Sequence, residues 1–378
     1  MHTSRSATRA ATIAAAITAI ALAPFTARAQ IASTAAPDDI AALRAQIAAL
    51  DQKLKVLERN LELKDEAAVA EAKKQPKITA SDGRFEVASA DGANSLRLRG
   101  LVQGDARFYF DDANATTDKF LLRRARLIFE GKFAERFNYV VQPEFAGSTV
   151  SILDAFVNTA VTPSVNVQVG RFKTPVGLEQ LQSDPVAFFN ERSIATNLAP
   201  NRDVGVQVFG SVLEQRLSYQ ASITNGVIDG GNSTPASDNN EGDFTYAGRL
   251  FATPFVNDKD SALKGLGFGL AGATGNYRGS TSATLLNAYR SDGQQNIFAY
   301  RTNTTPTAAN TTVAAGTATA LSPQAHYYYG PFGVLAEYFR NSADLSIGSG
   351  TAQNAREVTN TAYNLSVGYV LTGEDSTF

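Results

Sequence analysis

The chain contains no cysteine and no tryptophan, and only two histidines among its 378 residues. The absence of cysteine excludes disulfides, thiolate metal sites and a cysteine nucleophile, and two histidines are too few for a histidine-built metal centre or triad. The 34 basic residues are balanced by 36 acidic ones, which is not the composition of a protein that coats nucleic acid. We therefore expect no metal, no cofactor, no catalytic residue and no nucleic-acid partner.

The chain also lacks an apolar run of the roughly 20 residues that a membrane-spanning helix needs. The apolar stretch 10–23 is shorter, follows Arg5 and Arg9, and is followed by Ala27 and Ala29 in an A-x-A pattern. This order is typical of a secretory signal, whereas a membrane anchor would require a longer run. We expect residues 1–29 to be a signal peptide and residues 30–37 to be a short linker.

A heptad pattern follows in residues 38–75. Apolar residues alternate spacings of three and four at Ile40, Leu43, Ile47, Leu50, Leu54, Leu57 and Leu61. This spacing predicts a helix with one apolar seam, as in coiled coils. Pro37 stands where a helix can begin and Pro76 where it must end. We expect an oligomeric coiled-coil stalk over 38–75 and a linker over 76–93. A lone amphipathic helix lying on another surface is the alternative, and the seam does not fix the number of helices.

From residue 94 onward the period changes to two. In the segment 96–110, one face is apolar and carries Leu96, Leu98, Val102, Ala106, Phe108 and Phe110. The opposite face is mainly polar and carries Arg97, Arg99, Leu101, Gln103, Asp105, Arg107 and Tyr109. The run is longer than the usual globular strand of about five or six residues and matches the roughly ten-residue strands of membrane barrels.

The alternation recurs along the chain and predicts about twelve strands. The further segments are 119–130, 136–144, 150–159, 164–172, 203–210, 216–224, 243–253, 264–276, 321–329, 332–340 and 359–372. Long and short connections alternate between them, as in outer-membrane barrels. We expect an all-β fold, an antiparallel transmembrane β-barrel over residues 94–378, surrounded by outer-membrane lipid and enclosing water.

Arginines dominate the predicted water-facing side of this barrel. The candidate anion-pathway residues are Arg97, Arg99, Arg107, Arg124, Arg126 and Arg249. A guanidinium group stays charged and its fork matches phosphate oxygens, and rows of basic side chains let pores reject cations. The alternative is that these arginines pair with Asp105, Glu144 and Asp154 and only solvate the wall of a weakly selective porin.

The connection 174–201 is too apolar for a simple exposed loop. It could fold into the channel, where Lys173 and Arg192 would help to form a constriction. Equally, it could pack on a neighbouring subunit, because long loops in compact folds are usually functional without revealing how.

Several motifs resemble the phosphate-selective porins O and P. They include the run GRFKTPVGLE at 170–179, LRRAR at 122–126 and NRDVGV at 201–206, and the resemblance spans about residues 96–374. It implies a homotrimer of barrels of about 16 strands in the bacterial outer membrane, which pass inorganic phosphate, pyrophosphate or polyphosphate.

Two features depart from this resemblance. Similar proteins continue through further strands after residues 371–374, so we expect a barrel that is incomplete at its C-terminal end. Only some of them carry a helical stalk, which would be periplasmic here. A second hypothesis is therefore that the stalk contacts the cell wall or a periplasmic partner and that the barrel anchors this tether.

Overall fold

The computed structural model describes residues 37–81, 84–110, 118–227, 229–233, 243–302, 310–348 and 354–376. The chain divides into two units, Met1–Ala72 and Lys73–Phe378, which are described separately. The expected signal peptide and the linker up to residue 36 lie outside the described residues.

The first unit contains one long helix, α1 (Pro37–Ala72). Its sequence is rich in Ala, Leu, Glu, Lys and Arg, which are the strongest helix formers, and Lys55 supports it through a 2.9 Å ion pair with Asp51. The predicted helix is confirmed, although it ends before residue 75. Its seam is exposed: the side chains of Leu43 and Leu50 are 61% and 64% accessible. In the part of the chain that the structure describes, no helix is long and apolar enough to cross a membrane.

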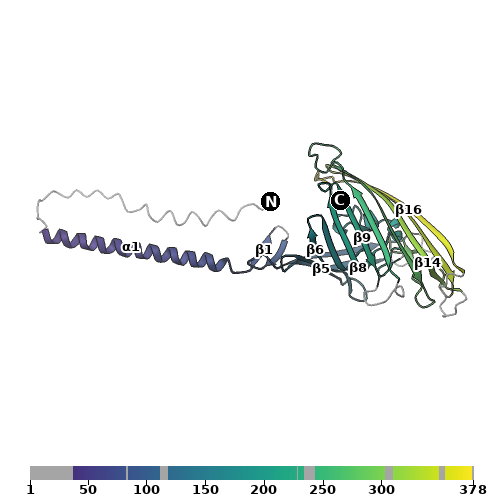
Figure 1. Ribbon diagram of the computed structural model, residues 1–378, viewed down its shortest axis with the longest axis horizontal. Coiled ribbons are helices and arrows are strands. Elements are labelled where there is room, and N and C mark those ends of the chain that lie inside the picture. The colour runs from purple at the N-terminus through teal and green to yellow at the C-terminus, as the bar shows by residue number, and fades with distance from the viewer. Residues whose placement is uncertain are drawn as a thin grey trace. The chain divides into compact units, whose positions relative to one another are not determined.

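The second unit is mostly β and is built on one large antiparallel sheet of 14 strands (Figure 1). Its strands are β1 (Lys77–Ser81), β2 (Arg84–Ala88), β3 (Ser95–Arg107), β4 (Lys119–Phe133), β5 (Phe137–Glu144), β6 (Ser151–Thr162), β7 (Val165–Lys173), β8 (Arg202–Val212), β9 (Leu217–Thr224), β10 (Thr245–Ala252), β11 (Gly265–Arg278), β14 (Thr312–Tyr329), β15 (Phe332–Ile347) and β16 (Arg356–Tyr369). Each strand pairs with its neighbour in this order, so β1 and β16 are the edge strands within the described residues.

The remaining elements lie in two connections. The connection between β7 and β8 holds α2 (Leu178–Leu181), η1 (Asp184–Val186) and η2 (Ile194–Leu198). The connection between β11 and β14 holds a small two-stranded sheet, β12 (Tyr289–Arg290) and β13 (Asn296–Phe298).

Every predicted strand corresponds to a strand of the large sheet, from β3 to β11 and from β14 to β16. The expectation of a linker over 76–93 is wrong, because β1 and β2 pair with each other and extend the sheet from β3. Each of these two strands has only five residues, so the alternation of polar and apolar side chains along it is too short to be recognised in the sequence. Strand β14 begins at Thr312 instead of 321, because its first nine residues are mostly Ala and Thr, which differ little in polarity and hide the alternation.

The two faces of the strands differ as the alternation predicts. On β3, Val102 is 77% exposed, whereas the side chains of Asp105 and Arg107 are only 13% and 12% exposed. Phe108 and Leu96 are also exposed, at 60% and 41%. The apolar side chains therefore lie on the uncovered face of the sheet, and the charged ones lie on the face that other parts of the chain cover.

A β-bulge in β4 interrupts this alternation. Gln103 pairs with Arg124 and Gly104 pairs with Leu122, so Arg123 has no partner in the register. An extra residue of this kind changes which face of the sheet the neighbouring side chains occupy. Leu122 stays on the exposed face, while Arg123 and Arg124 both turn to the covered face, where they contact the same carboxylate of Glu191.

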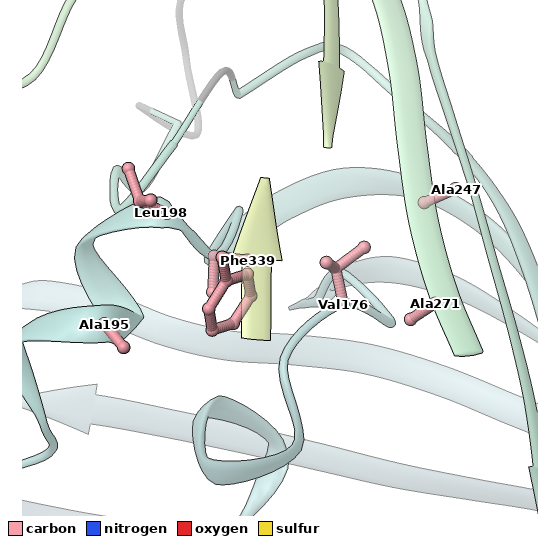
Figure 2. Close-up of a cluster of buried hydrophobic side chains, with 7 residues drawn as sticks. Val176, Ala195, Leu198, Ala247, Ala271 and Phe339 are labelled. Atoms are coloured by element: carbon pink, nitrogen blue, oxygen red, sulfur yellow. The ribbon is translucent and has the colours of Figure 1, made fainter. Parts of the chain in front are cut away.

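Loop 174–201, the connection between β7 and β8, packs against the covered face. Figure 2 shows Val176 of the loop, together with Ala195 and Leu198 of η2, around Phe339 of β15. Val176 and Phe339 are fully buried, and Ala199, Ala247 of β10 and Ala271 of β11 complete the cluster. The loop therefore lies on the sheet of its own chain, and its apolar residues form the main hydrophobic core of this unit.

Candidate anion-pathway site

The GRFKTPVGLE motif directs the chain from β7 into loop 174–201. Gly177 has φ of +88°, a left-handed conformation that favours glycine. The turn points the next two backbone N–H groups at the buried carboxylate of Glu337 on β15: Leu178 donates at 2.6 Å and Glu179 at 3.1 Å. One charged side chain therefore accepts two otherwise unpaired donors at the start of α2, which fixes the entry of the loop.

The middle of the loop is held by arginines of β4, a strand that lies near the opposite end of the sheet from β15. Asp184 of η1 accepts a hydrogen bond from Arg126 and lies 3.6 Å from a guanidinium nitrogen of Arg124. Arg192 of the loop donates to Asp184 at 2.7 Å and to the Gln182 carbonyl at 2.8 Å. The loop thus bridges β15 and β4 across the covered face of the sheet.

Asp184 remains a carboxylate in this setting. Burial alone would raise its pKa, but the guanidinium groups of Arg192, Arg126 and Arg124 hold the pKa of Asp184 well below its ordinary value. The contacts that it makes therefore persist as the pH falls through the range in which free carboxylates take up protons.

Glu191 lies at the centre of a second arginine group. Its carboxylate accepts both a Nε–H and, at 2.9 Å, a Nη2–H from Arg123. Arg124 donates to the same group at 3.2 Å and Arg107 at 3.3 Å. Gln294 adds a donor at 3.4 Å. A single carboxylate thus meets three guanidinium groups from two neighbouring strands.

The segment 280–302 also contacts the arginine group around Glu191. The Gly293 carbonyl accepts hydrogen bonds from Arg107 at 2.9 Å and from the Tyr109 hydroxyl at 3.2 Å. Arg290 and Asn197 exchange hydrogen bonds through the Arg290 backbone, at 3.0 and 2.8 Å. Two connections of the chain therefore meet each other and the arginines of β3 and β4.

A polar cavity of about 460 Å³ lies where these segments meet. Its charged lining residues are Arg123, Arg124, Arg192, Arg290 and Glu191, and the rest of the lining is mainly Asn, Gln, Ser, Thr and Gly. Among the described residues, no group accepts a hydrogen bond from the guanidinium of Arg290, whose side chain is exposed. Four arginines and one glutamate thus line the cavity.

The structure brings together only part of the predicted set. Arg107, Arg124, Arg126 and Arg192 lie in the connected network described above. Arg97 and Arg99 lie apart from it and share Glu130, at 3.4 and 2.7 Å. Arg97 and Arg99 lie near the start of β3, and Glu130 lies near the end of β4, where it is the register partner of Arg97.

Two further candidates have other surroundings. Arg249 on β10 donates to Gln324 at 3.0 Å, and its guanidinium carbon lies 4.4 Å from the centre of the Phe251 ring. Lys173 donates to the Gln182 carbonyl at 2.7 Å and so supports the loop from within. Neither residue lines the cavity.

The ion pairs of the alternative interpretation are also present. Arg107 pairs with Asp105 at 2.8 Å and Arg126 with Glu144 at 2.5 Å. The third carboxylate, Asp154, pairs instead with Arg202 at 3.0 Å, which was not among the candidates. In the network that includes the loop, the guanidinium groups of Arg107, Arg123, Arg124, Arg126 and Arg192 meet the carboxylates of Asp105, Glu144, Asp184 and Glu191. Positive charge is therefore in excess, but most of it is paired.

Sequence reasoning missed three residues of this site. Strict alternation with Arg124 and Arg126 would put Arg123 on the apolar face, and only the bulge turns its side chain to the covered face. Glu191 and Arg290 lie in connections, where no periodicity indicates the direction of a side chain. The LRRAR run at 122–126 was the one sequence signal for Arg123, because three arginines in five residues cannot all be placed on one face of a regular strand.

The sequence profile of the phosphate-selective porin O and P family matches residues 96–378. A Caulobacter vibrioides protein described as an uncharacterized protein is 28% identical over 193 residues, which cover 43% of this chain and 38% of that protein. The chain thus spans well under half the length of this curated relative. The family match covers the whole large sheet from β3 onward, and the chain belongs to the phosphate-selective porin O and P family.

Proposed function

We propose that the protein is an outer-membrane porin whose water-filled channel prefers anions and passes inorganic phosphate, pyrophosphate or polyphosphate. Family membership supports an outer-membrane porin in general, and a channel rather than an enzyme. The observation that carries the anion preference is the polar cavity, which Arg123, Arg124, Arg192 and Arg290 line against a single carboxylate.

The chemistry of this lining suits a tetrahedral oxyanion. Each guanidinium presents planar N–H donors that can meet two phosphate oxygens at once, and it stays charged at any physiological pH. A cation entering the same space would meet an excess of positive charge at short range. Several such groups in sequence allow an ion to enter and leave, because no single site holds it tightly. Arg97 and Arg99, and Arg249 on the opposite wall, would form the more distant parts of this pathway.

Loop 174–201 would form the constriction. It crosses the covered face of the sheet from Glu337 on β15 to Arg126 on β4. The pairing of its own Asp184 and Arg192 holds charged groups of the loop beside the cavity. A loop anchored at both walls narrows the passage without closing it.

A closed barrel and a trimer belong to the same proposal. Unpaired edge strands are costly in lipid, so β1 and β16 would have to be covered or paired in the membrane. The exposed Leu43 and Leu50 of α1 support a coiled coil that joins several subunits on the periplasmic side. Chemical crosslinking of the protein in detergent, with and without residues 38–72, tests this assembly.

The experiment that tests the channel is electrical. The protein is inserted into planar lipid bilayers under a KCl gradient, and the zero-current potential is measured. We expect a potential whose sign indicates chloride selectivity, and a chloride current that inorganic phosphate reduces. A potential of the opposite sign or near zero, with no effect of phosphate, would reject the anion preference.

A tether is the second candidate function. The exposed seam of α1 favours it, because a helix with an apolar stripe needs a partner, and the cell wall or a periplasmic protein would also provide one. If the helix is a tether, deletion of residues 38–72 weakens the cell envelope and leaves the conductance of each channel unchanged.

A further inference from the structure

The carboxylate of Glu191 occupies the position in which an oxyanion would meet the arginines. The Nε and Nη2 donors of Arg123 both reach it, which is the fork geometry that guanidinium groups also use with phosphate. Arg124 and Arg107 complete a three-sided set of donors around it. The cavity therefore already contains one anionic group, supplied by the chain itself.

Glu191 is also free to exchange, because its neighbours hold the loop independently of it. The Asn190 carbonyl accepts a hydrogen bond from Arg124 at 2.9 Å. On the other side, the Ser193 backbone N–H donates to Glu179 at 3.0 Å, and Arg192 binds Asp184. The Glu191 side chain can thus turn away from the arginines while the backbone on both sides stays anchored.

We propose that Glu191 is a specificity-determining residue that acts as a built-in competitor for the permeating anion. An oxyanion entering the cavity takes the donors of Arg123, Arg124 and Arg107 by displacing Glu191, and Glu191 recaptures them when the anion leaves. The competition weakens the binding of each anion and so prevents it from blocking the channel. This inference rests on the proposed anion preference and adds to it the group that limits affinity.

The test is the concentration of inorganic phosphate that halves the chloride current of single channels in planar bilayers. In E191Q the competing charge is lost while the side chain keeps its size. We expect the half-blocking concentration to fall about tenfold, the scale of removing one charge close to the bound anion. E191D keeps the charge on a shorter side chain and is expected to lie between E191Q and the wild type.

E214Q is the matched control. Glu214 lies in the turn between β8 and β9, its side chain is 80% exposed, and it pairs only loosely with Arg216 at 4.0 Å. The same chemical change there is expected to leave the half-blocking concentration at the wild-type value. The double variant R123Q/E191Q should lose the gain of E191Q, because the donors for which Glu191 competes are then incomplete.

The direction of the change separates competition from loosening of the loop. If Glu191 only fastened loop 174–201, E191Q would raise the chloride conductance and weaken the phosphate block, and the inference would be overturned. An unchanged half-blocking concentration in both E191Q and E191D would overturn it as well. If the wild type shows neither chloride selectivity nor phosphate block, the proposed function falls, and the inference falls with it.

Discussion

The carboxylate of Glu337 accepts the backbone N–H of Leu178 at 2.6 Å, although the two residues are 159 positions apart in the chain. Glu337 is 4% exposed and also accepts from the Glu179 N–H and the Ser322 hydroxyl. A strand near one end of the sheet thus holds the loop that the arginines near the other end contact. The position of this loop therefore depends on a few charged groups that lie far apart in sequence.

Glu337 should be needed to hold loop 174–201 in place. In E337Q the amide nitrogen cannot accept a hydrogen bond, so one of the two loop N–H groups loses its partner, at a cost of about 1–3 kcal/mol. We expect a larger and noisier single-channel conductance and a weaker phosphate block. The control E357Q makes the same change on the exposed side chain of neighbouring β16 and should behave as the wild type. An unaltered conductance in E337Q would show that the loop is held by other contacts.

Gly177 should not tolerate a side chain. A Cβ there would lie 2.9 Å from the Ala199 Cβ and 3.0 Å from the Gln180 Cβ, at a left-handed φ of +88°. We expect G177A to lower the free energy of unfolding by about 1–3 kcal/mol, which thermal unfolding in detergent would detect. In the control G104A a Cβ meets nothing within 4 Å, so little change is expected. Equal stability of the two variants would contradict the turn geometry.

Arg123 should contribute to selectivity because the bulge in β4 turns it toward Glu191 and the cavity. We expect R123Q to reduce the anion-to-cation permeability ratio by roughly fivefold, equivalent to about 1 kcal/mol at the cavity. R136Q removes the same charge from the exposed turn between β4 and β5 and is the control. If both variants keep the wild-type zero-current potential, Arg123 faces lipid and the bulge is not part of the functional protein.

A pH effect is expected from Asp229, which lies in the connection between β9 and β10. Burial raises its pKa to about 6, and the hydrogen bonds from Tyr289 and Asn287 offset this only in part. Because the folded protein prefers the protonated acid, stability is lost as the pH rises from about 4 through 6. We expect the free energy of unfolding of the wild type to fall over this range by on the order of 3 kcal/mol, with a lower unfolding temperature, and the change to be smaller in D229N. Parallel pH curves for the two proteins would exclude this role.

The strands could be predicted from sequence because their side chains have to be sorted between two faces. Val102 and Arg107 differ so strongly in polarity that the period of two is evident over the whole of β3. The same rule failed where the backbone breaks its period. The bulge that admits Arg123 leaves no composition signal, and the strands β1 and β2 are too short for an alternation to be distinguished from chance.

The site was predictable only in outline. Arg107, Arg124 and Arg126 could be assigned to the polar face because they alternate with apolar residues such as Ala106, Ala125 and Leu127. Their partners could not, because Glu191 and Asp184 lie in a connection whose path depends on contacts such as that of Glu337 with Leu178. Sequence left two possible locations for loop 174–201, and only the packing of Val176 against Phe339 shows which sheet it covers.

The most direct test of the account is whether the charged face of β3 meets water while the apolar face meets lipid. Since the chain has no cysteine, single cysteines can be placed without background at 97, 99, 103, 105 and 107, and at 96, 98, 102, 106 and 108. A charged, membrane-impermeant thiol reagent is applied to the protein in lipid vesicles. We predict modification and reduced current at the odd-numbered positions only. Modification at the even-numbered positions instead would contradict a channel lined by the charged face of β3.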